Sequence, residues 1–164
     1  MTSPAITALA EDVIKRYSAH DLMIATAESC TGGLIAAHLT DIPGSSSVLD
    51  RGFVTYSNDA KSEMLGIPAT LIEEHGAVSE DVAGAMATGA LTNSKADVAI
   101  AVTGIAGPGG GSEEKPVGLV YIACIKKGSE AIVSKELFGD IGRDQVREKT
   151  VLKALEMLLD QLLP

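Results

Sequence analysis

Aromatic side chains are scarce in this sequence, since they make up 3% of the 164 residues and tryptophan is absent. The 46% of residues that are hydrophobic must therefore be mostly Ala, Val, Ile and Leu. An aliphatic core of this kind suits helices packed closely on a sheet better than an aromatic-rich β-sandwich. A chain of this length lies within the range of one domain. We therefore expect a single α/β domain over residues 1–164.

Basic charge is also scarce. The chain has 13 Lys and Arg against 22 Asp and Glu, which gives a formal net charge of -9. A protein that binds the phosphate backbone needs a concentrated basic surface, and the sequence offers no basic cluster larger than pairs such as Lys126–Lys127. We therefore expect no nucleic-acid partner, and the charge points to small-molecule chemistry or to a protein partner.

Cysteines and long apolar runs are few as well. Cys30 and Cys124 lie far apart and show no CxxC spacing, so neither a disulfide scaffold nor a zinc site is expected. No segment approaches the ~20 uninterrupted apolar residues that a membrane span needs. The first residues are amphipathic and acidic rather than a basic leader before an apolar run. These features predict a cytoplasmic protein with no membrane contact.

Apolar periodicity predicts helices that mostly alternate with strands. The predicted helices cover residues 3–18, 34–39, 58–65, 68–74, 80–92 and 143–162, with Ser3, Asn58 or Asp59, and Ser79 as caps. The predicted strands cover residues 22–27, 51–57, 97–103, 117–125 and 131–137. The pattern favours a three-layer α/β/α sandwich on a mixed, mostly parallel sheet.

The first candidate site is Glu28-Ser29-Cys30-Thr31-Gly32-Gly33, between a predicted strand and a predicted helix. Ligands of open α/β sheets bind at such strand ends, and the helix start offers free N–H groups to an anion or oxyanion. Ser29 or Cys30 could serve as an exposed nucleophile there. The alternative is an ordinary helix start, capped by Ser29 or Thr31.

A serine nucleophile needs a base, and none of the three histidines lies in a recognisable triad pattern. A lysine can replace histidine where desolvation lowers its pKa. Lys61, at a strand-to-helix junction, is the candidate, with Tyr56 relaying or orienting the proton. The alternative is a solvated surface lysine.

A glycine-rich loop from Thr103 to Ser112 follows the most apolar predicted strand, and its N–H groups could form an anion-binding concavity. It matches neither the Walker A pattern nor GxGxxG. The alternative is a flexible surface loop.

Arg143 and Arg147 open the last helix, where cations are mildly unfavourable. One could bind a substrate phosphate, or both could form salt bridges with acids such as Asp144 or Glu148.

Taken in order, AESCTGG, PGSSSV, GFVTYSNDAK, GAVSE and AVTGIAGPGGGSEEKPVGLVYIA resemble the CinA C-terminal domain family over nearly the whole chain. The resemblance implies the same three-layer fold. The best-characterised members of the family are nicotinamide-nucleotide amidases. The resemblance therefore also implies hydrolysis of nicotinamide mononucleotide to nicotinate mononucleotide and ammonia, in pyridine nucleotide recycling. Neither a metal nor an organic cofactor is expected.

The resemblance also implies roles for single residues. Ser29 corresponds to the nucleophile, Lys61 to the base and Tyr56 to its partner. Thr103 would hold the amide or the oxyanion, and Arg143 would contact the phosphate. Backbone N–H groups of Thr31, Gly32 and Gly33, or those after Thr103 beginning with Gly104, would stabilise the oxyanion.

Many family members have an additional N-terminal domain that this sequence lacks, so we expect none of that domain's activities. The family name refers to competence and DNA damage, but the acidic charge balance gives no support for direct DNA contact. A non-catalytic nucleotide-binding or adaptor domain is the alternative function, and thiol chemistry at Cys30 is a third. A homo-oligomer is expected, packed through the small-residue helix 80–92 or the apolar C-terminal helix.

Overall fold

The computed structural model describes residues 3–164, which form one five-stranded sheet in the order β2-β1-β3-β4-β5. The strands are β1 (Ile24–Glu28), β2 (Leu49–Val54), β3 (Val98–Gly104), β4 (Leu119–Lys126) and β5 (Ile132–Leu137). The helices are α1 (Pro4–Ala19), α2 (Leu34–Thr40), α3 (Asn58–Leu65), α4 (Ala69–His75), α5 (Glu80–Thr92) and α6 (Arg143–Asp160), with a 3-10 turn η1 (Ser45–Ser47).

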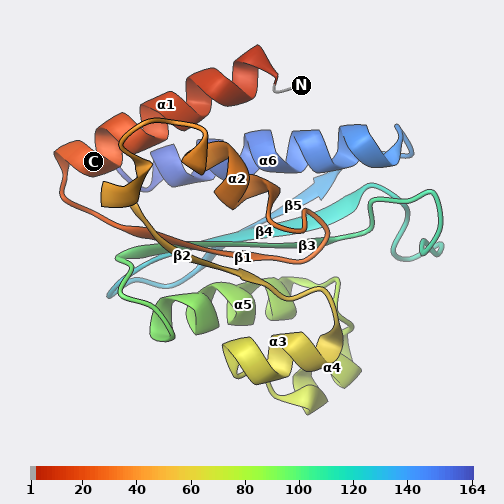
Figure 1. The fold of residues 1–164 in the computed structure, drawn as a ribbon. Helices are drawn as coiled ribbons and strands as arrows, with labels where there is room; N and C mark the ends of the chain where they lie inside the picture. Colours follow the sequence, from red (N-terminus) through yellow and green to blue (C-terminus); the bar gives the residue numbers. More distant parts are fainter. Residues whose placement is uncertain (1–2) are drawn as a thin grey trace.

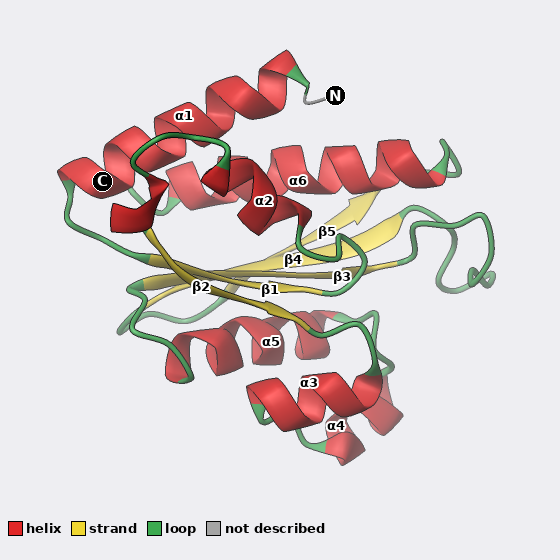
Figure 2. Cartoon of the chain, in the orientation of Figure 1, coloured by secondary structure: helices red, strands yellow, loops and turns green. Residues whose placement is uncertain are grey.

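The sheet is mixed but mostly parallel. Strand β1 pairs in parallel with both β2 and β3, whereas β4 pairs antiparallel with β3 and with β5. Only β4 therefore runs against the other strands of the described chain. Helices α1, α2 and α6 cover one face of the sheet, and α3, α4 and α5 cover the other (Figures 1 and 2). The predicted three-layer α/β/α sandwich is confirmed.

The two faces of the central strand β3 are built from side chains of different size. Val98, Ile100 and Val102 pack in the core beneath α1 and α6, whereas Ala99 and Ala101 pack in the core beneath α5. Side chains alternate between the faces of a strand, so one sequence supplies both layers. Because α5 itself packs with Ala83, Ala87 and Ala90, small residues meet small residues and the helix lies close to the sheet.

The two helices expected to form an oligomer interface, α5 and α6, pack their apolar faces against the sheet of the same chain. The small residues of α5 and the apolar residues of α6, such as Leu155 and Leu158, are buried against the sheet. Apolar side chains exposed to solvent lie elsewhere, with Ile132 and Leu137 on β5 exposed by 61% and 65%. The expected homo-oligomer stays a prediction. The apolar faces of α5 and α6 are not available for it, because they are buried within the chain.

Two of the predicted caps need correction. Ser57, not Asn58 or Asp59, is the N-cap of α3, and its hydroxyl accepts the N–H of Ala60 at 3.0 Å. Ser3 is the N-cap of α1 but makes no side-chain capping bond. The predicted cap of α5 is confirmed, since the Ser79 hydroxyl accepts the N–H of Val82 at 3.2 Å.

No described helix combines the length and apolarity that a membrane crossing requires.

Candidate active site

A pocket of about 220 Å³ lies at the edge of the sheet where the parallel strands β1 and β3 end. This edge is where ligands of α/β sheets bind. Residues from well-separated segments line the pocket: Ser29, Cys30, Tyr56, Asn58, Lys61, Ala77, Val78, Thr103, Gly104, Ala106 and Arg143. The set includes Ser29, Tyr56, Lys61, Thr103, Gly104 and Arg143, to which the family resemblance gave roles.

Lys61 and Ser29 form the centre of the pocket. Lys61 is 1% exposed, and its Nζ donates hydrogen bonds to Ser29 Oγ and to the Thr55 carbonyl oxygen, both at 3.2 Å. The surface-lysine alternative is therefore wrong. Burial lowers the pKa of the Lys61 amine below its usual value, and the nearby Cys30 thiol acts in the opposite direction. A lysine in this setting is suited to hold and release a proton.

The turn that presents Ser29 depends on a buried carboxylate. Glu28, the last residue of β1, is 1% exposed and accepts the Thr31 hydroxyl at 2.6 Å. The same carboxylate accepts the N–H groups of Ile35 at 2.8 Å and Ala36 at 3.2 Å, in the first turn of α2. It thus replaces a capping side chain, because the N-cap position of α2 is occupied by Gly33. Sequence reasoning missed this role of Glu28.

Thr31, Gly32 and Gly33 shape the turn but do not line the pocket. Thr31 is fully buried, and its hydroxyl is bonded to Glu28. The two glycines have φ values of +60° and +106°, which favour glycine, and the Gly32 N–H donates to the Ser29 carbonyl at 3.0 Å. They therefore lie outside the pocket lining, and their contact with substrate stays a prediction. The alternative of Ser29 or Thr31 as the cap of α2 is wrong, because Gly33 occupies the N-cap position.

Arg143 and Tyr56 meet at the rim of the pocket. Arg143 Nη2 donates to Tyr56 Oη at 3.0 Å, and Nη1 donates to the Gly107 carbonyl at 2.8 Å. Tyr56 is 62% exposed, and no described hydrogen bond joins it to Ser29 or Lys61. The geometry thus pairs Tyr56 with the arginine rather than with the lysine.

Thr103 and Gly104 form the floor on the β3 side. The Thr103 hydroxyl donates to the Ala77 carbonyl at 2.8 Å, which ties the pocket-lining segment 77–78 to the strand. A Cβ on Gly104 would lie 2.6 Å from Val120 Cγ2 and 2.9 Å from the Leu119 carbonyl oxygen. Only glycine therefore lets β3 and β4 stay this close beside the pocket.

Arg147 forms neither of the salt bridges weighed from the sequence. Its Nε donates to the Cys30 carbonyl at 3.1 Å and its Nη2 donates to the Thr31 carbonyl at 3.2 Å. No ion pair of Arg147 with Asp144 or Glu148 occurs among residues 3–164. The spacing of Arg147 one turn after Arg143 was the available signal, but it did not indicate backbone carbonyls as the partners.

Cys30 is a poor candidate for the nucleophile. Its side chain is 6% exposed, and burial raises the pKa of the thiol to about 12. The thiolate is the reactive form of cysteine, so this thiol stays protonated and unreactive near neutral pH. Across the described residues, no group of three or more His, Cys, Asp or Glu side chains is placed to hold a metal ion.

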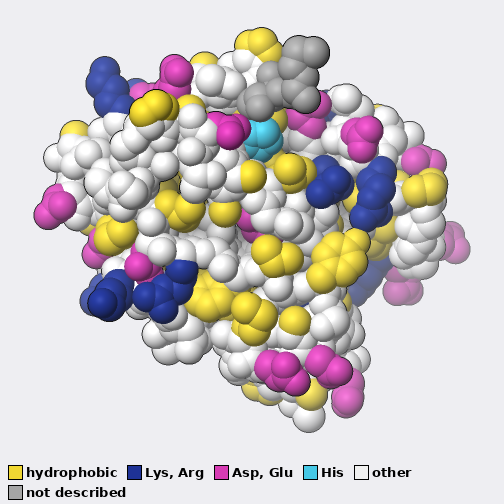
Figure 3. All heavy atoms as spheres, in the orientation of Figure 1, with side chains coloured by type: hydrophobic (Ala, Val, Ile, Leu, Met, Phe, Trp, Pro, Cys, Tyr) yellow, Lys and Arg dark blue, Asp and Glu magenta, His cyan; other side chains and the backbone are white. Residues whose placement is uncertain are grey.

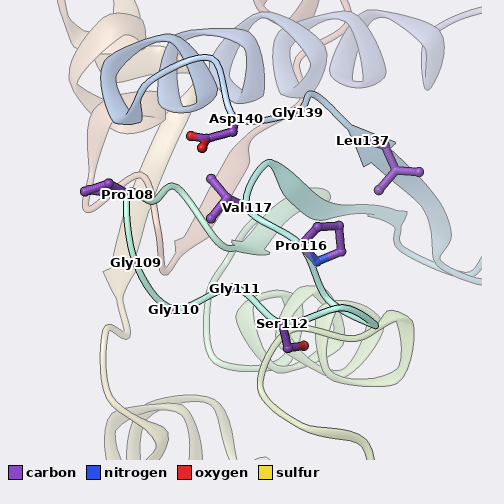
Figure 4. Close-up of a pocket in the computed structure, with 10 residues that line it drawn as sticks. All are labelled: Pro108, Gly109, Gly110, Gly111, Ser112, Pro116, Val117, Leu137, Gly139 and Asp140. Carbon is purple, nitrogen blue, oxygen red and sulfur yellow. The ribbon is translucent and has the colours of Figure 1, made fainter.

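The glycine-rich loop borders a second cavity of about 620 Å³ (Figure 4). Its ten lining residues run over Pro108–Ser112, Pro116–Val117, Leu137 and Gly139–Asp140. They include the Asp140 carboxylate, which lies on the Pro108 side in Figure 4, and no lysine or arginine. An anion in this cavity would therefore depend on backbone N–H groups, and the predicted anion site of the loop stays a prediction. On the face drawn in Figure 3, Lys and Arg side chains form a few small groups among acidic and apolar ones.

Comparisons with known proteins agree with the family resemblance of the sequence motifs. The model of the CinA C-terminal domain matches residues 6–162. The chain is 48% identical over 164 residues to nicotinamide-nucleotide amidohydrolase PncC of Escherichia coli K12, covering 99% of this chain and 98% of that protein. It is 50% identical over 158 residues to a CinA-like protein of Akkermansia muciniphila, of whose length it spans 38%.

A solved structure gives the same result for the fold. The competence/damage inducible protein CihA from Agrobacterium tumefaciens is 52% identical, with a TM-score of 0.96 over 98% of this chain and 97% of that one. The family match extends over nearly all of the chain, and the fold agrees at high identity. The chain therefore belongs to the CinA C-terminal domain family.

Proposed function

We propose that this chain is an amidohydrolase that converts nicotinamide mononucleotide to nicotinate mononucleotide and ammonia. The observation that supports this most directly is the buried Lys61 amine, 3.2 Å from Ser29 Oγ and with a lowered pKa. A nucleophile beside a base of suitable pKa is the arrangement that acyl transfer requires. The full-length relative named nicotinamide-nucleotide amidohydrolase supports the choice of substrate.

The first half of the reaction forms an ester on Ser29. Neutral Lys61 accepts the hydroxyl proton of Ser29 as Oγ attacks the carboxamide carbon, while the bond to the Thr55 carbonyl orients the amine. The carbon–nitrogen bond of the tetrahedral intermediate then breaks. Protonated Lys61 gives its proton to the departing nitrogen, which leaves as ammonia. The product is an acyl-enzyme with neutral Lys61 restored.

The second half releases the acid. Lys61 accepts a proton from a water molecule as that water attacks the ester carbon, and the Ser29–carbon bond then breaks. The proton returns to Ser29 Oγ, so serine and lysine regain their starting states. The sum of both halves is one amide and one water converted to one acid and one ammonia.

The backbone N–H of Gly104 is our candidate for the oxyanion donor. Along β3, Val98 donates to the Met23 carbonyl and Val102 accepts from the Ser29 N–H, whereas Ile105 donates to Leu119 of β4. The backbone groups of even-numbered residues thus face β1, so the Gly104 N–H points to where Ser29 turns away. One such donor typically contributes ~3 kcal/mol to the transition state.

Thr103 and Arg143 would orient the substrate. The Thr103 hydroxyl donates to Ala77, so its oxygen is free to accept the N–H of the carboxamide. Arg143 lies at the rim beside Tyr56, and a guanidinium matches the oxygens of a phosphate. We therefore assign the phosphate to Arg143 and the nicotinamide ring to the interior of the pocket.

A non-catalytic nucleotide-binding domain remains the alternative function. Such a domain has no need of a buried amine beside a serine hydroxyl, and burial of an amine without an acid partner costs stability. The experiment measures ammonia and nicotinate mononucleotide formed from nicotinamide mononucleotide in the presence of a chelator, by wild type, Lys61→Met and Lys127→Met. Lys127 is an exposed lysine away from the pocket.

We expect turnover by wild type and by Lys127→Met, and loss of at least about 100-fold in Lys61→Met, as for a general base. Circular dichroism confirms that each variant is folded. A folded wild type that binds the nucleotide and releases no ammonia supports the binding domain instead.

A further inference from the structure

Arg147 is the remaining basic side chain at the start of α6, and the proposed reaction does not use it. It does not line the Ser29 pocket. Its guanidinium donates hydrogen bonds to two backbone carbonyls, both in the turn after Ser29. We propose that Arg147 is a positioning residue that holds this turn, and with it Ser29 Oγ, in the geometry that reaction requires. This inference rests on the proposed function.

The contact is a fork on two consecutive carbonyls. Nε binds the Cys30 oxygen at 3.1 Å and Nη2 binds the Thr31 oxygen at 3.2 Å. The residues concerned are the first and second after the nucleophile. Hydrogen bonds from a charged donor are stronger than neutral ones, and the planar guanidinium fixes the direction of both. The position of Ser29 is therefore coupled to α6.

The turn contains two glycines, so its shape depends on hydrogen bonds. Gly32 and Gly33 follow with φ values of +60° and +106°, and glycine moves between backbone conformations at low cost. Within the turn, Gly32 donates to the Ser29 carbonyl and Leu34 to the Thr31 carbonyl. Arg147 is the donor that the described structure provides for the Cys30 carbonyl.

Arg147 and Glu28 hold the segment from its two ends. The Glu28 carboxylate binds the N–H groups of Ile35 and Ala36, whereas Arg147 binds the carbonyls before them. Glu28 is the end of a central strand. Arg147 is fixed by its neighbours in α6, since Val146 and Val151 are fully buried. Loss of the Arg147 contact would remove the charged donor from the Cys30 and Thr31 carbonyls and loosen the turn that holds Ser29 Oγ beside Lys61.

The planar guanidinium also distinguishes this arginine from an ordinary surface cation. Lysine keeps the charge but presents a single point donor and cannot bind two carbonyls as a fork. Arg147→Lys thus separates the effect of charge from the effect of geometry.

The test compares wild type, Arg147→Lys, Arg147→Gln and Arg16→Gln. Arg16 is an exposed arginine of α1 that pairs with Asp12, and it serves as the matched control. Two readouts are taken: kcat and KM for nicotinamide mononucleotide, and amide hydrogen exchange of the peptide covering residues 28–34. Thermal unfolding confirms that each variant is folded at the assay temperature.

We expect kcat to fall about 10- to 100-fold in both Arg147 variants, as for misplacement of a reacting group, with KM little changed and faster exchange in residues 28–34. Arg16→Gln is expected to match wild type in both readouts. Unchanged kcat in folded Arg147→Gln, or a rise in KM alone, would overturn the proposal. If wild type releases no ammonia, the proposed function fails by itself. Exchange then decides: faster exchange in Arg147→Gln supports the positioning role, and unchanged exchange overturns it.

Discussion

At the scale of single residues, the site depends on an amine that folding removes from water. Lys61 is 1% exposed and bonds to Ser29 and to the Thr55 carbonyl. Burial disfavours the charged form of an amine, which is why its pKa falls. The property that makes Lys61 a base at moderate pH is thus also a cost to the folded state whenever the amine is protonated.

The first prediction concerns stability against pH. The pKa of Lys61 is lowered in the folded state from 10.5 in the unfolded chain. Between the two values the unfolded chain binds more protons, so the free energy of unfolding rises with pH through this window. Lys61→Met lacks the titration. We expect the difference between wild type and Lys61→Met to shift in favour of wild type as pH rises toward 10.5, measured by urea unfolding. A pH-independent difference would contradict the buried-amine account.

The second prediction concerns the phosphate. A hydrogen bond to a charged group is worth about 1.5–3 kcal/mol, so Arg143→Gln is expected to lower kcat/KM for nicotinamide mononucleotide by about 10- to 100-fold. Nicotinamide riboside has no phosphate and serves as the control substrate. Its kcat/KM is expected to change little. Equal losses for both substrates would show that Arg143 acts through the Gly107 loop or Tyr56 instead.

At the scale of elements, the place of Lys61 depends on how α3 packs against α5. A Cβ on Gly89 of α5 would lie 2.2 Å from the Leu65 carbonyl oxygen and 2.9 Å from Leu65 Cβ at the end of α3. The two helices therefore touch through a position where only glycine fits. At Gly84, five residues earlier in α5, the nearest atom to an added Cβ is Val133 Cγ2 at 3.9 Å.

The third prediction compares these two glycines. Gly89→Ala is expected to lower the free energy of unfolding by about 1–3 kcal/mol, as overpacking does, and to lower kcat because α3 moves Lys61 away from Ser29. Gly84→Ala is expected to stabilise the helix by about 0.5–1 kcal/mol with kcat unchanged. Urea unfolding and steady-state rates check both. Wild-type kcat in Gly89→Ala would show that the Lys61 position tolerates a shift of α3.

Periodicity predicted the helices and strands well because it reports which face of each element is buried. The Val-Ala alternation of β3 is such a signal, and it is local in the sequence. The Ser79 cap is a second local signal, because its partner Val82 is three residues away. The contacts that build the site are not local. Glu28 caps α2 from the end of β1, and Arg147 reaches 117 residues back to Cys30. At Ser57, three adjacent residues were all suitable caps, so composition could not choose among them.

At the scale of the whole molecule, one sheet divides two cores. Leu155 lies in the core under α1 and α6, and Met86 lies in the core under α5, each with 0% exposure. Both cores contain side chains of β1 and β3, such as Ile24 and Ala25 on successive positions of one strand. Neither core can therefore lose its packing without disturbing the strands that complete the other.

The fourth prediction follows from that shared sheet. Leu155→Ala and Met86→Ala are each expected to lower the free energy of unfolding by about 2–5 kcal/mol. Each variant is expected to unfold in one transition, with far-ultraviolet circular dichroism and tyrosine fluorescence coinciding. Two separate transitions in either variant would show that the layers unfold independently.

The proposed amide hydrolysis requires Ser29, and not Cys30, as the nucleophile. The most direct measurement is the rate of ammonia release from nicotinamide mononucleotide by folded wild type, Ser29→Ala and Cys30→Ala, side by side. We predict turnover by wild type and by Cys30→Ala, and none above background by Ser29→Ala. Ammonia release by Ser29→Ala at a rate near that of wild type would contradict the claim.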